Sequence, residues 1–197
     1  MAKTFHEFAS SVIATLETLN IRYAIGGSVA SSAYGAYRST NDIDISIEMA
    51  LSESERFIKA FTALGYYVYI DAILDAVIWH TPFNVIDAES GYKADFFLVE
   101  PTPLQVSLFQ RTQLVPYDAE SGAEAIMYSI EDVIVYKLKY FAEGKMPKHP
   151  RDILAMLEMH HDTIDVEYVS HWANETNVLE IWNEILDEHH QRMSKNK

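Results

Sequence analysis

The chain has 197 residues, of which 49% are apolar, and this is enough for one hydrophobic core. The formal charge of −14 argues against a general nucleic-acid binder, because such binding depends on Lys and Arg meeting phosphates, although RNA docking on a local basic patch stays compatible with it. The sequence has no cysteine, which excludes disulfide bonds and thiolate metal sites.

The amino-terminal residues contain no apolar signal segment. No run in the sequence approaches the ~18 apolar residues of a membrane-spanning helix. We therefore expect a cytoplasmic protein without a membrane segment.

The first half of the chain shows helical and strand-like patterns in turn. Helices are predicted over 4–19, 28–34 and 52–64. Strands are predicted over 21–25, about 43–48, 66–70, 83–87 and 92–99, and the last two are expected to form an antiparallel pair.

The second half begins with two short predicted strands, over 111–115 and 124–128, and is helical from Ile130 onward. Breaks are expected near Pro147 and Pro150, Thr163 and Asn174, which gives four helical segments. The fold class is therefore α+β, with an amino-terminal mixed sheet flanked by helices and a carboxy-terminal helical bundle. We expect an α/β core over residues 1–128 and a helical region over 129–197 that packs on it.

Two carboxylates stand out in the strand over 43–48 and at its start. The run Asp42-Ile43-Asp44-Ile45-Ser46-Ile47-Glu48 alternates polar and apolar residues, as a half-buried strand does, so Asp42 and Asp44 share one face about 7 Å apart. Like charges at this separation are unfavourable unless a cation lies between them. Oxygen ligands of this kind suit Mg²⁺, which takes one or two carboxylates and substrate phosphates.

The Gly26-Gly27-Ser28 turn precedes this strand. Glycine lets backbone N–H groups approach an anion, a following helix directs its positive end there, and the Ser28 hydroxyl adds a donor. An ordinary strand-to-helix turn capped by Ser28 is the alternative, and the two downstream aspartates favour the phosphate interpretation.

Together, Gly26-Gly27-Ser28, a spacer of thirteen residues and Asp42-Ile43-Asp44 resemble the motif of the nucleotidyltransferases of the DNA polymerase beta superfamily. The likeness covers roughly residues 21–152, and the spacer looks most like the branch that includes type IV toxin nucleotidyltransferases. The resemblance implies two Mg²⁺ ions, an NTP such as ATP as co-substrate, and a third acid from a later strand.

Asp95 is the predicted third acid, because it interrupts an apolar strand that we expect to be buried on both faces. Asp87, one strand earlier, is its competitor, and an ordinary ion pair with Lys or Arg is the structural alternative for Asp95. The predicted catalytic and metal-binding set is therefore Asp42, Asp44 and Asp95.

Lys137 occupies the apolar face of the helix that begins at Ile130, where it either snorkels to the surface or reaches a triphosphate. The resemblance favours the triphosphate, since related toxins carry a functional lysine in this helix. Arg38 is expected to clamp a phosphate or the acceptor, or to pair with Asp42. The predicted nucleotide-binding residues are Gly26, Gly27, Ser28, Arg38 and Lys137.

Five basic residues within fifteen positions form the one basic patch of this acidic chain: Lys137, Lys139, Lys145, Lys148 and Arg151. This patch suits the phosphates of an NTP or an RNA end, or is simply a solvated loop. Asp152 either orients a nucleophile or caps a helix after Pro150, and we favour the cap. The tyrosines are expected mostly as packing residues in strands.

The sequence thus predicts Mg²⁺-dependent transfer of a nucleotidyl group from an NTP to a hydroxyl of a tRNA 3′ end, a protein or a small molecule. A toxin with an antitoxin partner is one version of this prediction. The alternative is a protein of the same fold that binds a nucleotide or a partner without turnover.

Overall fold

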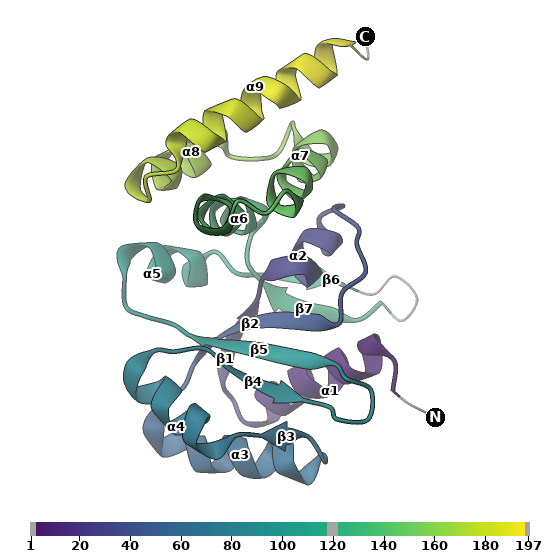
Figure 1. Cartoon of the computed structure of the whole chain (residues 1–197), viewed down its shortest axis with the longest axis vertical. Helices are drawn as coiled ribbons and strands as arrows, with labels where there is room; N and C mark the ends of the chain where they lie inside the picture. The colour runs from purple at the N-terminus through teal and green to yellow at the C-terminus, as the bar shows by residue number, and fades with distance from the viewer. Residues whose placement is uncertain (1–2, 118–121, 196–197) are drawn as a thin grey trace.

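The computed structural model describes residues 3–117 and 122–195, whose strands form one mixed sheet in the order β3-β4-β5-β2-β1-β7-β6 (Figure 1). The strands are β1 (Arg22–Ile25), β2 (Asp42–Glu48), β3 (Tyr67–Val68), β4 (Phe83–Ile86), β5 (Lys93–Leu98), β6 (Gln113–Pro116) and β7 (Glu124–Met127). The central pairs β2–β5 and β1–β7 are parallel, and the other neighbours run antiparallel.

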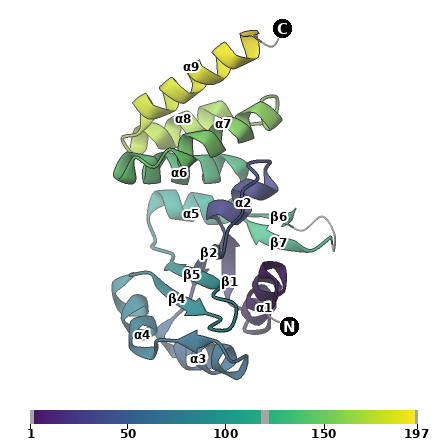
Figure 2. The same cartoon turned by 45° about the vertical axis from the view of Figure 1, so that its right-hand side comes forward.

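Helices cover both faces of the sheet, as the two views in Figures 1 and 2 show. One face carries α1 (Phe5–Thr18), α3 (Ser54–Ala63), which follows a 3₁₀ turn over Leu51–Glu53, and α4 (Ile70–Trp79). The other carries α2 (Gly27–Ala33), α5 (Pro103–Gln110) and α6 (Ile130–Gly144). The helices α7 (Lys148–His160), α8 (Val166–Glu175) and α9 (Leu179–Lys195) stack beyond α6.

One face of the sheet is buried, and the other is only partly covered. In β2, Ile43, Ile45 and Ile47 are fully buried, and the polar residues between them are only partly covered or exposed. The buried face packs against α3, where the Phe57 ring meets Phe96 of β5 edge to face with centroids 5.3 Å apart. The period of two therefore places every polar residue of β2 on the face toward α6.

The predicted α+β class is confirmed, and most predicted elements are present within a few residues. Three predictions were wrong in part. The strand expected over 66–70 is only two residues long, and the chain turns into α4 at Ile70. Neither α4 nor α5 was predicted. Pro150 lies inside the first turn of α7, where proline is tolerated, so the break falls at Lys145–Pro147 alone.

None of the helices among the described residues has the length and apolar character that a membrane span requires. The helices α6 to α9 pack against one another. The division of the chain after residue 128 into two units stays a prediction.

Candidate functional site

Parallel pairing of β2 with β5 brings two of the three predicted acids face to face. Asp44 lies directly opposite Asp95, and Asp42 lies two residues earlier in β2, opposite Lys93. Neighbouring strands are about 4.8 Å apart, so the Asp44 and Asp95 side chains leave the same face of the sheet close together. Asp42 is more exposed than either of them, at the start of β2.

Asp95 has a basic partner on its own strand. The Lys93 ammonium lies 2.8 Å from the Asp95 carboxylate, and this hydrogen bond raises the pKa of Lys93 above its usual range. The expectation that β5 is buried on both faces was wrong, because its residues alternate between buried and half-buried. Asp95 is therefore stabilised by both a half-open environment and an ion pair.

Asp87, the competitor for the third acid, lies in the turn after β4, and its carboxylate accepts a hydrogen bond from the Glu89 N–H at 3.1 Å. Asp87 lies two residues after Val85, whose side chain is buried on the face of the sheet that packs against α3. Asn84, on the other face, lies opposite Asp95. Asp87 also lies 3.8 Å from the ammonium of Lys3, which precedes α1. It therefore points away from the face that carries Asp44 and Asp95.

The Gly26-Gly27-Ser28 turn wraps around Asp44. The Gly26 N–H donates to the backbone carbonyl of Asp44 at 2.9 Å, and the Ser28 N–H donates to the Asp44 carboxylate. Gly27 has φ of +57°, and a Cβ there would lie 2.5 Å from Cγ and 2.9 Å from Cβ of Asp44. Only glycine fits this position, for reasons of both conformation and space.

Asp44 carries an unfavourable charge in this structure. Burial raises the pKa of its carboxyl above the usual range, and Asp95 and Asp42 raise it further. The hydrogen bond from Ser28 and the charge of Lys137 lower it, but they do not cancel the burial. A cation beside Asp44 would relieve this repulsion.

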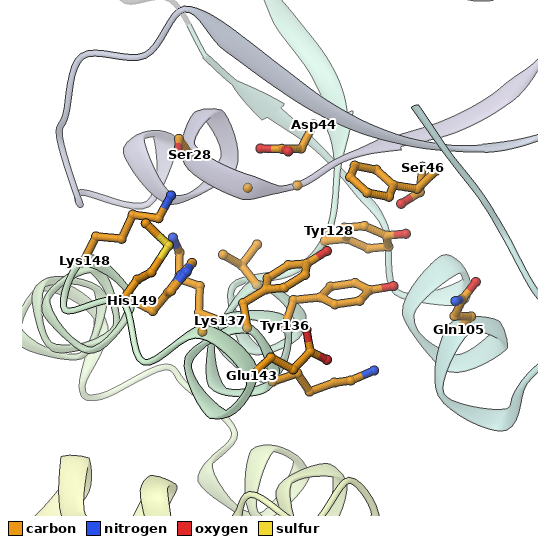
Figure 3. Close-up of a pocket in the computed structure, with 18 of the residues that line it drawn as sticks. Ser28, Asp44, Ser46, Gln105, Tyr128, Tyr136, Lys137, Glu143, Lys148 and His149 are labelled. Atoms are coloured by element: carbon orange, nitrogen blue, oxygen red, sulfur yellow. The ribbon is translucent and has the colours of Figure 1, made fainter. Parts of the chain in front are cut away.

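A cavity of about 710 Å³ opens between this face of the sheet and α6 (Figure 3). The turn and Asp44 line one side, and Lys137 and Lys148 lie across from them. Its volume falls within the range of small-molecule and cofactor sites. The predicted turn, acid and lysine thus share one cavity.

Lys137 is held in this cavity by an ion pair. Its side chain is only 5% exposed, and its ammonium lies 2.6 Å from the Asp152 carboxylate. Burial lowers the pKa of Lys137, and the hydrogen bond with Asp152 raises it. Snorkelling is therefore excluded, and the favoured capping role of Asp152 was wrong, because α7 already begins at Lys148.

Arg38 lies beside the turn and contacts Ser28, and its contact with a phosphate or the acceptor stays a prediction. Its guanidinium donates to the Ser28 hydroxyl from Nε at 3.0 Å and from Nη2 at 2.6 Å. It also lines a second, smaller cavity of about 330 Å³, together with residues of α1 and α2. Arg38 thus orients the Ser28 hydroxyl, and no ion pair with Asp42 forms.

The basic patch is divided by the structure. Lys137, Lys139 and Lys148 line the large cavity, whereas Lys145 and Arg151 are exposed and are not part of its wall. The patch is therefore neither a solvated loop alone nor one continuous surface. Three lysines and Asp44 thus line the same cavity.

A row of tyrosines forms a wall of the cavity that the sequence analysis missed. Tyr136 and Tyr140 of α6 lie with ring centroids 6.2 Å apart and planes 18° apart, and Tyr128 meets Tyr136 at 5.4 Å. All three line the cavity. The separation of four residues between Tyr136 and Tyr140 in a helix was the signal for this row.

Asp44 and Asp95 are the residues that would hold a Mg²⁺ ion. Among the described residues, no group of three or more His, Asp or Glu side chains is arranged to hold a metal ion. Asp44 and Asp95 are two hard carboxylate donors at one register, which together with substrate phosphates is the set that Mg²⁺ prefers. The pair therefore fits the ion, and a second ion at Asp42 stays a prediction.

Two solved structures share this fold. The solution structure of the antibiotic-resistance factor ANT(2'')-Ia has a TM-score of 0.57 at 15% identity, with 93% of this chain and 95% of that chain covered. The crystal structure of an antigenic nucleotidyltransferase-like protein from Paracoccidioides brasiliensis has a TM-score of 0.56 at 17% identity, with 93% and 92% covered. No family model and no curated protein matches the sequence. The fold is therefore nucleotidyltransferase-like.

Proposed function

We propose that this protein transfers a nucleotidyl group from an NTP to a hydroxyl acceptor. The observation that carries the proposal is the wrapping of the Gly26-Gly27-Ser28 turn around Asp44, opposite Asp95 and at the wall of a 710 Å³ cavity. The nucleotidyltransferase-like fold of the two solved structures supports it. The likeness to the toxin branch rests on the sequence motif alone.

The bound NTP would place its phosphates between the turn and α6. The Ser28 hydroxyl, oriented by Arg38, would donate a hydrogen bond to a phosphate oxygen. The Lys137 ammonium, which is paired with Asp152 in this structure, would supply positive charge to the same phosphates. The base would lie against Tyr136 and Tyr140, because aromatic faces stack on nucleobases.

Asp44 and Asp95 are the groups nearest to the proposed reaction. Mg²⁺ bound by them would neutralise the charge of the phosphates and of the leaving pyrophosphate. The acceptor oxygen forms a bond to the α-phosphorus while the bond to the bridging oxygen of the β-phosphate breaks. The proton of the acceptor hydroxyl passes to the Asp95 carboxylate.

The acceptor is the least defined part of the proposal. A tRNA 3′ end, a protein hydroxyl and a small molecule all remain candidates, and the chain's charge of −14 weakens the case for tRNA. A toxin paired with an antitoxin would be one biological setting for the transfer.

One observation favours a second candidate, a protein that binds a nucleotide without turnover. The Lys93 ammonium lies 2.8 Å from Asp95, where it competes with a metal ion for that carboxylate. If this ion pair persists with nucleotide bound, the site holds the NTP but does not transfer it. The two candidates differ in product, not in binding.

The test is to incubate the purified protein and cell extract with Mg²⁺ and each of the four NTPs, and to measure added mass on RNA, protein and small molecules. Transfer should occur with the wild type and be lost in Asp44→Asn. Glu48→Gln is the matched control, because Glu48 lies at the far end of the same strand, opposite Arg22, and outside the cavity. Nucleotide binding without any product would favour the second candidate, and no binding at all would refute both.

A further inference from the structure

The helix α4 exposes four large apolar side chains within ten residues, rather than the single scattered apolar residues that are ordinary on protein surfaces. Ile70, Leu74 and Ile78 follow one another at four-residue spacing and are 50%, 36% and 52% exposed, and Trp79 is 71% exposed. Ile73 and Ala76, on the opposite side of the helix, are fully buried. Ile70, Leu74 and Ile78 thus form a stripe, Trp79 lies at its carboxy-terminal end, and apolar patches of this kind mark interaction sites.

The charged residues of α4 itself have a single sign. Asp71 and Asp75 are exposed on the same side of α4, next to the stripe, and the helix has no Lys or Arg. The whole chain carries a charge of −14. A partner with Lys or Arg around its apolar residues is therefore complementary to this surface, and RNA is repelled by it.

A second copy of the chain is a poor occupant for the same reason. Symmetric pairing through α4 would bring Asp71 and Asp75 of both copies to the rim of one interface, between two molecules that are each strongly acidic. Like charges across an interface cost free energy, so the charge pattern disfavours self-association. A basic polypeptide would be attracted to Asp71 and Asp75 rather than repelled by them.

The stripe also leads to the large cavity. The residue that follows Trp79 is His80, which ends α4 in a left-handed conformation and lines the cavity. Trp79 therefore lies one residue from the cavity wall, and tryptophan is a residue type that dominates binding energy at interfaces. A polypeptide seated on α4 would therefore end close to the cavity wall at His80.

We infer that the exposed face of α4, formed by Ile70, Leu74, Ile78 and Trp79 with Asp71 and Asp75, docks a polypeptide whose apolar side chains are flanked by Lys or Arg. Docking there requires neither nucleotide nor Mg²⁺. Docking on α4 is therefore tested independently of nucleotidyl transfer.

The test uses three synthetic helical peptides of about fourteen residues, or four turns. The first has Leu at every fourth position flanked by Lys, the second has Glu in place of Lys, and the third has Ser in place of Leu. Fluorescence anisotropy measures their binding to the wild type, to Leu74→Ser/Ile78→Ser and to Leu114→Ser. Leu114 is the matched control, because it is 59% exposed on β6, at the opposite edge of the sheet.

The Leu/Lys peptide should bind the wild type and Leu114→Ser equally, and Leu74→Ser/Ile78→Ser about tenfold more weakly or worse. The Glu peptide and the Ser peptide should bind much more weakly, and Asp71→Asn/Asp75→Asn should reduce the effect of salt on the first peptide. Equal affinity for all variants would overturn the inference, as would a Glu peptide that binds as tightly. Sedimentation that shows a wild-type dimer, lost in Leu74→Ser/Ile78→Ser, would assign the face to a second copy instead.

Discussion

Replacing Gly27 with alanine perturbs the contact between the turn and Asp44 directly. The new Cβ would lie 2.5 Å from Cγ of Asp44 and 2.9 Å from its Cβ, so the aspartate must move. Movement of its carboxylate breaks the hydrogen bond from the Ser28 N–H. The substitution therefore tests whether the turn and the acid are fitted to each other.

The expected loss of stability has two parts. An alanine at φ of +57° costs roughly 1–2 kcal/mol, because the left-handed conformation brings Cβ too close to the backbone. Loss of the hydrogen bond to a charged carboxylate costs about 1.5–3 kcal/mol more. We expect the free energy of unfolding of Gly27→Ala to fall by about 3–4 kcal/mol, as measured by urea titration followed by circular dichroism.

Gly65→Ala supplies the matched control. Gly65 has φ of +80°, and a Cβ there would meet nothing within 4 Å, so this variant should lose only the conformational part, about 1 kcal/mol. In an Asp44→Ala background the cost of Gly27→Ala should fall by about 1 kcal/mol or more, because the carboxylate is gone. Equal losses in Gly27→Ala and Gly65→Ala would refute the fitted contact between the turn and Asp44.

Three further predictions concern buried ionisable groups. Asp152→Ala should lower the free energy of unfolding by about 3–5 kcal/mol in urea titrations, because it leaves the Lys137 ammonium buried without its partner, and a loss well below this would contradict the buried ion pair. The Asp132 carboxylate accepts a hydrogen bond from the Tyr168 hydroxyl, and burial raises the pKa of Asp132 to about 6. The contribution of Asp132 to the free energy of unfolding is therefore present below about pH 4 and is lost as the pH rises through about 6. Urea midpoints across this range should show that trend in the wild type and not in Asp132→Asn. Burial lowers the pKa of His149 to about 4, so its contribution has the opposite sign and is lost as the pH falls from about 6.5 to about 4. A midpoint near 6.5 for His149 in an NMR titration would contradict its burial.

Strong periodicity made the central part of the fold predictable from the sequence. The alternation over Asp42–Glu48 predicts a half-buried strand and the shared face of Asp42 and Asp44, and both are present. The aromatic run over 66–70 misled the prediction because its residues have high β-propensity. The chain instead enters α4 at Ile70, and Ile73 and Ala76 of that helix are buried. Local propensity was overridden by tertiary context.

The partners of the site residues were harder to predict. The ion pair between Lys137 and Asp152 joins two helices across fifteen positions of the sequence, and no periodic pattern encodes the contact between those helices. The ion pair between Lys93 and Asp95 could have been predicted from the sequence, because residues two apart in a strand share a face. The metal and nucleotide roles of these residues remain predictions.

The central claim is that Asp44 and Asp95 bind Mg²⁺ together with an NTP held by the turn. The most direct measurement is the melting temperature with Mg²⁺ and a non-hydrolysable NTP, at an ionic strength matched with NaCl because the chain is strongly acidic. At about one hundred times Kd the wild type should gain about 2.7 kcal/mol, or roughly 5–10 °C. Asp44→Asn/Asp95→Asn should stay folded and lose this gain, whereas Glu48→Gln should keep it. An equal response of all three proteins, or no response of the wild type to any of the four NTPs, would contradict the claim.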